Sequence, residues 1–285
     1  MTQKIIRRVH PALRDDIGDL ITQRPVPSAH LDQIDPFLFL NHHGPQVYPP
    51  HNRGLPFGPH PHRGFETVTF ILDGLLAHRD SAGHESIIGP GGVQWMTAGS
   101  GLVHAEVSPQ EFMDKGGPLE ILQLWVNLPP ALKMTAPRYT GLQRDAIPVV
   151  ESDEGKVRVN LISGTYQGVT GPIASLTGVF MSTVEMQDGG RLVLDNLLER
   201  NPFVYVVKGG IDVAPDTVHS MHLAEFEPEG DTLEIVARGT TVLLLGHAEP
   251  IRAPVVAHGP FVMNTRQEIN QAIVDYQAGK FGAPL

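Results

Sequence analysis

The chain has 285 residues, no cysteine, and a formal net charge of −10 from 21 basic and 31 acidic residues. Without cysteine, disulfides, iron–sulfur clusters and thiolate zinc sites are excluded, and the acidic balance argues against non-specific nucleic-acid binding, which needs a basic face. The amino terminus has no apolar leader and no run of about 18 apolar residues occurs. We therefore predict a soluble, cytoplasmic protein that binds neither membrane nor nucleic acid directly.

The first half alternates short apolar segments with turn residues. The 30 glycines and 25 prolines are spread along the chain as turn residues, a pattern typical of an all-β architecture. Asp73-Gly74 after one apolar run is a hairpin signal. The predicted strands of this half are 35–40, 65–72, 86–88, 93–97, 102–107 and 119–128.

The second half repeats this rhythm. The strand and turn at 203–210 resemble those at 65–74, and the strand at 240–245 is aligned with the one at 102–107. A repeat of this size indicates two similar β-barrels, with a boundary within 135–155.

A helix is predicted over 265–277, with Asn264 or Thr265 as its N-cap and Glu268 at capping-box spacing. The predicted domains are therefore a metal-binding barrel over 1–140, a second barrel over 150–262, and a helix with a tail over 263–285.

Histidine indicates where the chemistry lies, because nine of the 14 histidines fall between positions 30 and 104. His60 and His62 are two apart in an extended segment, so their imidazoles point to one side. His104 and Glu106 form a second pair with the same spacing. Continuing the alternation from His62 predicts that the even positions of 65–72 face the barrel interior. Two such pairs can enclose one ion, and imidazole with carboxylate suits Fe(II), Ni, Cu, Mn or Zn.

The spacing of these residues resembles the two motifs of the cupin superfamily. Gly54, His60-Pro61-His62 and Glu66 match the first motif, and Gly101-Leu102-Val103-His104 matches the second. A longer resemblance, to the pirin family of bicupins, is carried by segments 60–69, 94–99, 104–106, 123–128 and 258–265. It implies an all-β fold of two tandem cupin (jelly-roll) barrels with a short C-terminal helix.

The two resemblances differ over the fourth ligand. The general cupin pattern implies Glu66, whereas the pirin pattern implies Glu106. Both lie an even number of residues from a histidine, so alternation along the strand permits either side chain to point toward the ion. We favour Glu106 because the pirin match is the more specific, and we place Glu66 beside the ligands or in the core. The predicted metal site is His60, His62, His104 and Glu106. It would hold one divalent transition metal per chain, with Fe(II) favoured over Ni, Cu, Mn or Zn.

The second barrel is predicted to lack a metal. The alignment places Asp195 and Leu197 opposite His60 and His62, and it places Val242 and Leu244 opposite His104 and Glu106. Aliphatic side chains do not ligate metals. His42, His43, His51, His247 and His258 are interpreted as loop histidines rather than ligands.

The pirin resemblance implies a quercetin 2,3-dioxygenase-like activity. A flavonol would bind the metal through its 3-hydroxyl, and Glu106 would accept that proton as general base before dioxygen addition releases carbon monoxide and a depside. A hydrophobic mouth for a flat aromatic substrate is predicted from Phe57, Phe65, Trp95, Met96 and Trp125.

Two alternatives stay open. One is a non-enzymatic, iron-dependent redox sensor that binds a protein partner, either a transcription factor or a metabolic enzyme. The other is a different cupin activity, such as a sugar isomerase.

Overall fold

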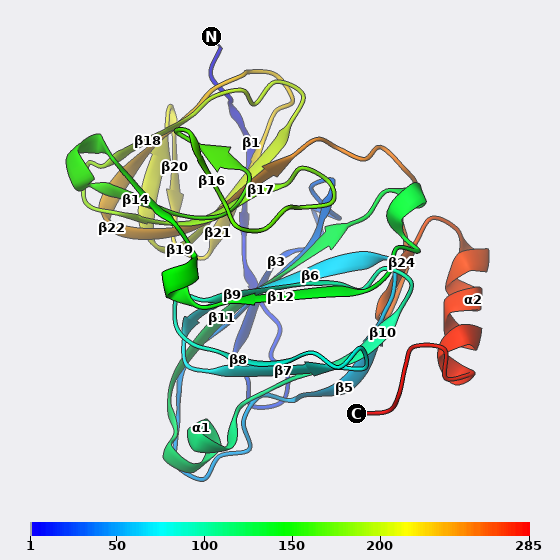
Figure 1. The fold of residues 1–285 in the computed structure, drawn as a ribbon. Helices are drawn as coiled ribbons and strands as arrows, with labels where there is room; N and C mark the ends of the chain where they lie inside the picture. Colours follow the sequence, from blue (N-terminus) through cyan, green and yellow to red (C-terminus); the bar gives the residue numbers. More distant parts are fainter. Residues whose placement is uncertain (1) are drawn as a thin grey trace. The chain divides into compact units, whose positions relative to one another are not determined.

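The computed structural model describes residues 2–285 and is built mainly from antiparallel strands (Figure 1). Within this range the only α-helices are α1 (Gln110–Lys115) and α2 (Arg266–Gln277). The predicted all-β class with a short C-terminal helix is thus confirmed. Neither helix is long and apolar enough to cross a membrane.

The chain forms two compact units. The first barrel unit contains residues 14–24, 37–144 and 251–285, and the second contains residues 2–13, 25–36 and 145–250. Each unit therefore includes one end of the chain. The N-terminal strand joins the second barrel unit, whereas the C-terminal helix packs within the first.

The barrel of the first unit is made of two sheets, and a separate two-stranded hairpin belongs to the C-terminal segment of the unit. In the seven-stranded sheet, the order is β12 (Arg138–Leu142), β9 (Val93–Thr97), β6 (Phe65–Asp73), β11 (Gly117–Asn127), β4 (Phe37–Tyr48), β3 (Thr22–Val26) and β2 (Leu13–Arg14). In the four-stranded sheet, it is β5 (Phe57–His62), β10 (Leu102–Val107), β7 (Leu76–Asp80) and β8 (Glu85–Ile88).

The odd-numbered residues of β6 face the interior of this barrel. Thr69 pairs with Gln94 on β9 and with Gln123 on β11, so these three side chains form one row on one face. Two residues along the same face, Ile71 and Ile121 pair within the apolar core. The prediction that even positions face inward is therefore wrong.

The reason for this error is a change of sheet between β5 and β6. The two strands are separated by Arg63-Gly64 and belong to different sheets, so alternation does not carry across the break. Gly64 has φ +89°, and a Cβ there would collide with the carbonyl oxygen of Val262. Glycine is required at this corner because any larger residue would be both strained and blocked.

Strand β4 also differs from the prediction. It was expected to end at residue 40, but it continues through His42 and His43 to Tyr48. Both histidines are buried strand residues, each hydrogen-bonded through its ring, to Glu120 and to Thr22 respectively. Their interpretation as loop residues is corrected, because pairing with β11 extends over the whole segment. The same correction applies to His247 and His258, which lie in the strands Leu233–Ala248 and Val256–His258.

The second barrel unit is dominated by one nine-stranded sheet. Its strands are β1 (Ile6–Pro11), β13 (Val149–Ser152), β14 (Val157–Ser163), β17 (Phe180–Met186), β18 (Arg191–Leu194), β19 (Asn201–Val213), β20 (Asp216–His219), β21 (His222–Phe226) and β22 (Leu233–Ala248). The hairpin β15 (Thr165–Tyr166) and β16 (Val169–Thr170) lies beside it, and a large aliphatic cluster fills the interior.

The strand at 203–210 corresponds to the one at 65–74 as predicted, but the predicted match of 240–245 with 102–107 is wrong by one strand. Residues 241–248 of β22 pair with β17 and β19, as β11 pairs with β4 and β6. The counterpart of β10 is instead the beginning of β22, which pairs with β18 as β10 pairs with β5. In the first barrel unit α1 separates the two stretches, whereas in the second they form one continuous strand.

The C-terminal segment begins with the hairpin β23 (Val256–His258) and β24 (Phe261–Met263). Helix α2 follows, capped by Thr265 in a capping box with Glu268, as the sequence predicted. Its buried Ile269 and Ala272 pack against Phe261 within the first barrel unit. Short 3₁₀ turns occur at η1 (Pro130–Leu132), η2 (Arg144–Ala146) and η3 (Asp153–Gly155).

Candidate metal centre

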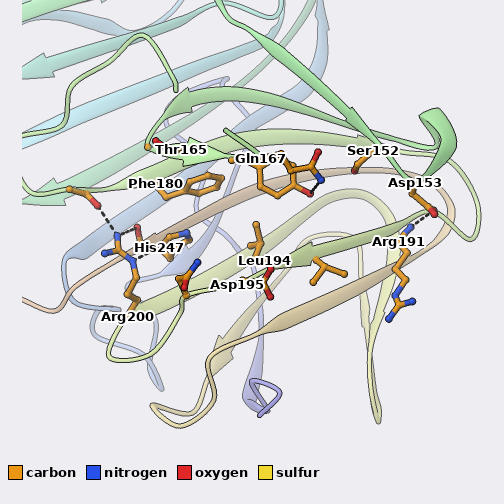
Figure 2. A pocket seen from close by; sticks show the side chains of 15 residues that line it. Ser152, Asp153, Thr165, Gln167, Phe180, Arg191, Leu194, Asp195, Arg200 and His247 are labelled. Carbon is orange, nitrogen blue, oxygen red and sulfur yellow. Dashed lines mark hydrogen bonds between the residues drawn. The ribbon is translucent and has the colours of Figure 1, made fainter. Parts of the chain in front are cut away.

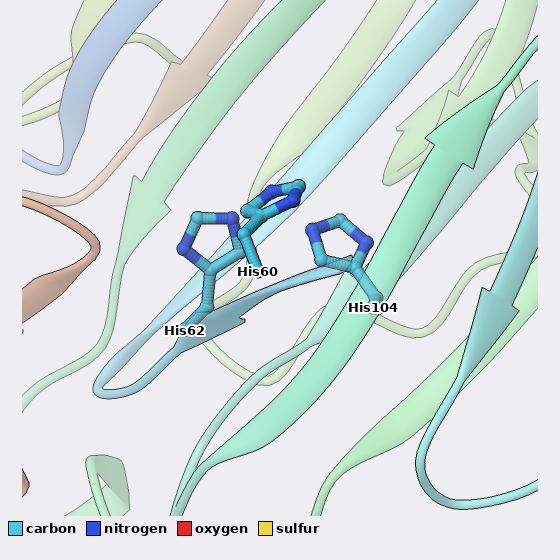
Figure 3. Close-up of side chains that lie close together, drawn as sticks. All are labelled: His60, His62 and His104. Carbon is cyan, nitrogen blue, oxygen red and sulfur yellow. The ribbon is translucent and has the colours of Figure 1, made fainter. Parts of the chain in front are cut away.

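Three histidines converge inside the first barrel unit (Figure 3). His60 and His62 end β5, and His104 on β10 is the direct cross-strand neighbour of His60. One ring nitrogen from each lies within 4.8 Å of the others. No other set of three or more potential metal-binding side chains comes this close together within residues 2–285.

Backbone hydrogen bonds fix the ring orientation of the two β5 histidines. The Nδ1 atom of His60 donates to the carbonyl oxygen of Gly58 at 2.8 Å, and that of His62 donates to the carbonyl oxygen of Pro260 at 3.2 Å. In the neutral form of both rings the proton is then on Nδ1, and the lone pair is on Nε2. Metal-bound histidines are oriented in this way by their second nitrogen.

His104 provides the test of whether a metal fits. It is fully buried, and neither of its ring nitrogens has a protein hydrogen-bond partner. Burying an unpaired polar group is unfavourable by about 1–3 kcal/mol, so the site favours an additional partner at this ring. Burial, together with the neighbouring histidines, lowers the pKa of His104 well below its usual value and that of His62 to about 3. Both rings are therefore neutral, the form that ligates metals.

Glu106 lies two residues beyond His104. Its carboxylate is held by the row of polar side chains formed by Thr69, Gln94 and Gln123, which we call the interior polar row. Thr69 Oγ1 donates to Oε1 at 2.9 Å, Gln94 Nε2 donates to the same oxygen, and Gln123 Nε2 donates to Oε2 at 2.6 Å. The side chain thus reaches from the four-stranded sheet to the seven-stranded sheet. Glu106 is not part of the compact histidine group.

The orientation of Gln94 is set by Tyr139 on β12. The Tyr139 hydroxyl donates to Gln94 Oε1 at 3.2 Å, which turns the amide NH₂ toward Glu106. The phenol also hydrogen-bonds Ser86, and its ring stacks on His78 at 4.0 Å. Sequence reasoning missed this network, although a glutamine in each of the two apolar strands β9 and β11 was a usable signal.

Glu66 occupies the opposite face of β6. It pairs with Thr97, whose hydroxyl donates to Glu66 Oε1 at 2.7 Å. Val68, two residues on, shares this face, whereas Thr69 is on the interior face that reaches Glu106. Burial raises the pKa of Glu66.

The corner after His62 is anchored by two buried cations. Arg63 donates from Nε to the carbonyl oxygen of Ser100 at 2.8 Å and pairs with Asp275 of α2 at 2.9 Å. Lys133 Nζ donates to the carbonyl oxygens of Gly64 and Val262, at 2.9 and 3.0 Å. These contacts hold the backbone next to His62 and so fix the direction in which its side chain points.

Aromatic rings line one side of the histidine group. The rings of Phe65 and Trp125 lie 5.0 and 5.4 Å from that of His62, and Phe39 stacks on Trp125 at 4.7 Å. Two of the five predicted mouth residues are thus beside the centre. Trp95 does not belong to this wall, because it pairs with Val68 on the outer face of β6.

The other two predicted mouth residues have different neighbours. Phe57 packs beside His43, with ring centroids 5.3 Å apart. Met96 is fully buried in a small cluster with Ala98 and Leu102.

Two barrels in one chain, with the three-histidine centre confined to the first, define a bicupin. The family descriptions "Pirin" and "Pirin C-terminal cupin domain" match residues 19–126 and 181–282. A pirin-like protein of Caulobacter vibrioides is 40% identical over 269 residues, which cover 94% of each chain. The chain belongs to the pirin family.

Solved structures agree with this assignment. A crystal structure of quercetin 2,3-dioxygenase from Acinetobacter baumannii matches with a TM-score of 0.92 and 32% identity, over 99% of this chain and 100% of that one. A bacterial pirin from Escherichia coli in complex with nickel(II) matches with a TM-score of 0.68 and 20% identity, over 85% and 99% of the two chains. The second match supports the fold alone.

Proposed function

We propose that this protein is an iron-dependent dioxygenase that cleaves a flavonol such as quercetin with release of carbon monoxide. The observation that carries the proposal is the convergence of three imidazoles beside an aromatic wall and a carboxylate held by hydrogen bonds. The similarity to a structure named quercetin 2,3-dioxygenase supports the same reaction class.

The proposed ligands are His60, His62, His104 and Glu106. Glu106 Oε2 accepts one hydrogen bond, from Gln123, whereas Oε1 accepts two, from Thr69 and Gln94, so Oε2 retains more free acceptor capacity. The position of Glu66 on the outer face of β6 supports the choice of Glu106.

The bound ion would supply a Lewis acid for the flavonol 3-hydroxyl and a redox partner for dioxygen. Glu106 would accept the 3-hydroxyl proton, because it lies on the same face of β10 as His104 and is ready as an acceptor. Gln94 and Gln123 keep its carboxylate in place through their amide donors. Phe65 and Trp125 would orient the flat ring system and exclude water. The overall reaction converts flavonol and dioxygen into a depside and carbon monoxide.

The activity is tested by aerobic assay of the Fe(II)-loaded protein with quercetin, following loss of flavonol absorbance together with carbon monoxide release. We expect turnover in the loaded wild type and none in His104→Ala treated in the same way. Absence of turnover with quercetin and with several other flavonols would refute the enzyme.

The ligand set is tested separately by iron content. We expect Glu106→Ala to lower the iron bound after purification far more than Glu66→Ala does, because only Glu106 shares the barrel interior with the histidines. Equal losses from the two variants would overturn the choice of Glu106.

The redox-sensing regulator stays a prediction, and no contact among the residues that the structure describes favours a particular protein partner. It is distinguished from the enzyme by pull-down with ferrous and with ferric protein. Capture that depends on the oxidation state, in the absence of flavonol turnover, would replace the dioxygenase proposal.

A further inference from the structure

The second barrel unit contains an open cavity of about 780 Å³ (Figure 2). It is formed by the ends of β17, β18 and β22 and by the connections after β14 and β18. Phe180 and Leu194 supply apolar surface, while Asp195, Arg200 and His247 supply polar groups. We propose that this cavity binds a neutral, hydroxyl-rich small molecule without a metal.

The cavity lies at the end of its barrel that corresponds to the metal centre. Phe180 on β17 and His247 on β22 are direct cross-strand neighbours, stacked at 4.6 Å with an angle of 5° between the rings. Phe39 and Trp125, beside the metal centre, form the same pair on the counterpart strands β4 and β11. The second barrel therefore keeps the mouth of a binding site at the place where its metal ligands are missing.

His247 offers one fixed donor to this cavity. Its Nδ1 accepts a hydrogen bond from Arg200 Nε at 2.7 Å, so the proton of the neutral ring must be on Nε2. Within residues 2–285, no protein group accepts from that Nε2–H. Arg200 is itself held in place by the carbonyl oxygens of Gly178 and His247, at 2.7 and 3.3 Å.

The charges around the cavity cancel. Asp153 and Asp195 balance Arg191 and Arg200, and His247 is neutral. Such a lining gives no net attraction to an anion or a cation. Asp195 has no hydrogen bond or ion pair to the described part of the chain, so it is available as an acceptor. A hydroxyl group can donate to Asp195 and accept from His247, and a molecule with several hydroxyls can do both at once.

The rim of the cavity is held in unfavourable backbone conformations. Asp153, Gln167 and Asn196 have φ values of 50°, 46° and 62°, in the left-handed region that glycine favours. Such strain persists only where the surroundings impose it, and it is enriched at binding sites. It supports a rim whose side chains have a fixed direction.

The proposal is tested by saturation-transfer NMR on the full chain at millimolar ligand. The probes are maltose and catechin, which are neutral and hydroxyl-rich, with glucuronate and glucosamine as charged sugars. We expect transfer to at least one neutral probe and weaker or no transfer to the charged sugars. Transfer to maltose or to catechin identifies a saccharide or a polyphenol as the source of the hydroxyls. No transfer to either neutral probe, or stronger transfer to a charged sugar, would overturn the proposal.

Two variants locate the binding. Asp195→Ala removes the exposed acceptor and should weaken transfer at least about five-fold, whereas Asp216→Ala, an exposed aspartate on β20 outside the cavity, should not change it. His104→Ala should also leave transfer to maltose intact, because that variant affects only the first barrel. Equal transfer to Asp195→Ala and wild type, or loss in His104→Ala, would refute this site.

Discussion

The interiors of the two barrels are built on corresponding strands with different side chains. In the first barrel, β5 and β10 contribute His60, His62 and His104, and the facing sheet contributes the polar row that holds Glu106. In the second, the inward residues of β18 and the start of β22 are aliphatic: Leu192, Leu194, Leu233 and Ile235.

This difference shows that the residues at a few inward-facing positions decide whether a barrel interior can bind a ligand or only adds to the hydrophobic core. Polar groups in a barrel interior must be hydrogen-bonded or ligated, which limits how they can pack. Aliphatic groups at the same positions contribute directly to the hydrophobic core. We therefore expect metal binding to depend on the first barrel, and the second barrel to depend on its packing.

The largest expected effect is the loss of metal from the first barrel. His104→Ala removes a buried side chain that we propose as a ligand. The affinity for iron should fall by more than the 10- to 100-fold, roughly, that loss of an outer partner of a metal ligand produces. Metal analysis of the purified protein measures this. The circular dichroism spectrum should be unchanged, since strand pairing does not involve the imidazole. Unfolding of the variant would show that the centre is structural.

In the second barrel we expect the opposite result. Ile235→Ala leaves a cavity in the aliphatic cluster and should lower the free energy of unfolding by about 2–5 kcal/mol. Iron content per folded chain should stay at the wild-type value. A denaturation curve together with metal analysis tests both statements, and loss of iron from this variant would break the comparison.

A pH effect is expected from His247. Burial, with Arg200 and Lys4 nearby, lowers its pKa to about 3. The unfolded chain, with an ordinary histidine pKa near 6.5, takes up the proton first on acidification. The stability associated with neutral His247 is therefore complete above about pH 6.5 and is lost as the pH falls toward 3.

His247→Gln should accordingly reduce the acid dependence of the unfolding free energy, by at most about 1.4 kcal/mol per pH unit. Denaturant titrations from neutral to acidic pH measure the slope. His219→Gln, at an exposed position on β20, is the matched control and should keep the wild-type slope. An unchanged slope in His247→Gln would contradict the assignment.

The smallest expected effect concerns the polar network. Tyr139→Phe removes the hydroxyl that orients Gln94 and should lower the unfolding free energy by about 1 kcal/mol, the contribution of one hydrogen bond. Iron should be retained, because the hydroxyl hydrogen-bonds Ser86 and Gln94 rather than His60, His62 or His104. Thermal unfolding with metal analysis provides the measurement. Iron loss comparable to that of Glu106→Ala would show that the network controls the metal itself.

Local features of this fold could be predicted from the sequence. The strands at 93–97 and 102–107 and the capped helix after Thr265 agree with the structure, because alternation and capping depend on neighbouring residues. The three histidines come together as their spacing predicted.

Features that depend on distant contacts were not predictable in this way. The predicted alternation of inward and outward side chains failed across Gly64, because the chain changes sheets there. Lys133 holds this corner by hydrogen bonds to the carbonyl oxygens of Gly64 and Val262. The alignment of the halves failed because the insertion of α1 is present in only one of them. The clamp on Glu106 required pairing between Thr69 and two strands far along the chain.

The first strand of the chain, β1, pairs with β21 of the second barrel, where Pro11 meets His222. These partners are 211 positions apart in the chain (222 − 11). At typical translation rates of 5–20 residues per second, β1 leaves the ribosome about 10–40 s before its partner exists. For that interval its backbone hydrogen-bonding groups have no strand partner, and Ile6 and Val9 have no barrel core to pack against. A fusion tag placed before this strand would act on the folding of the second barrel rather than the first.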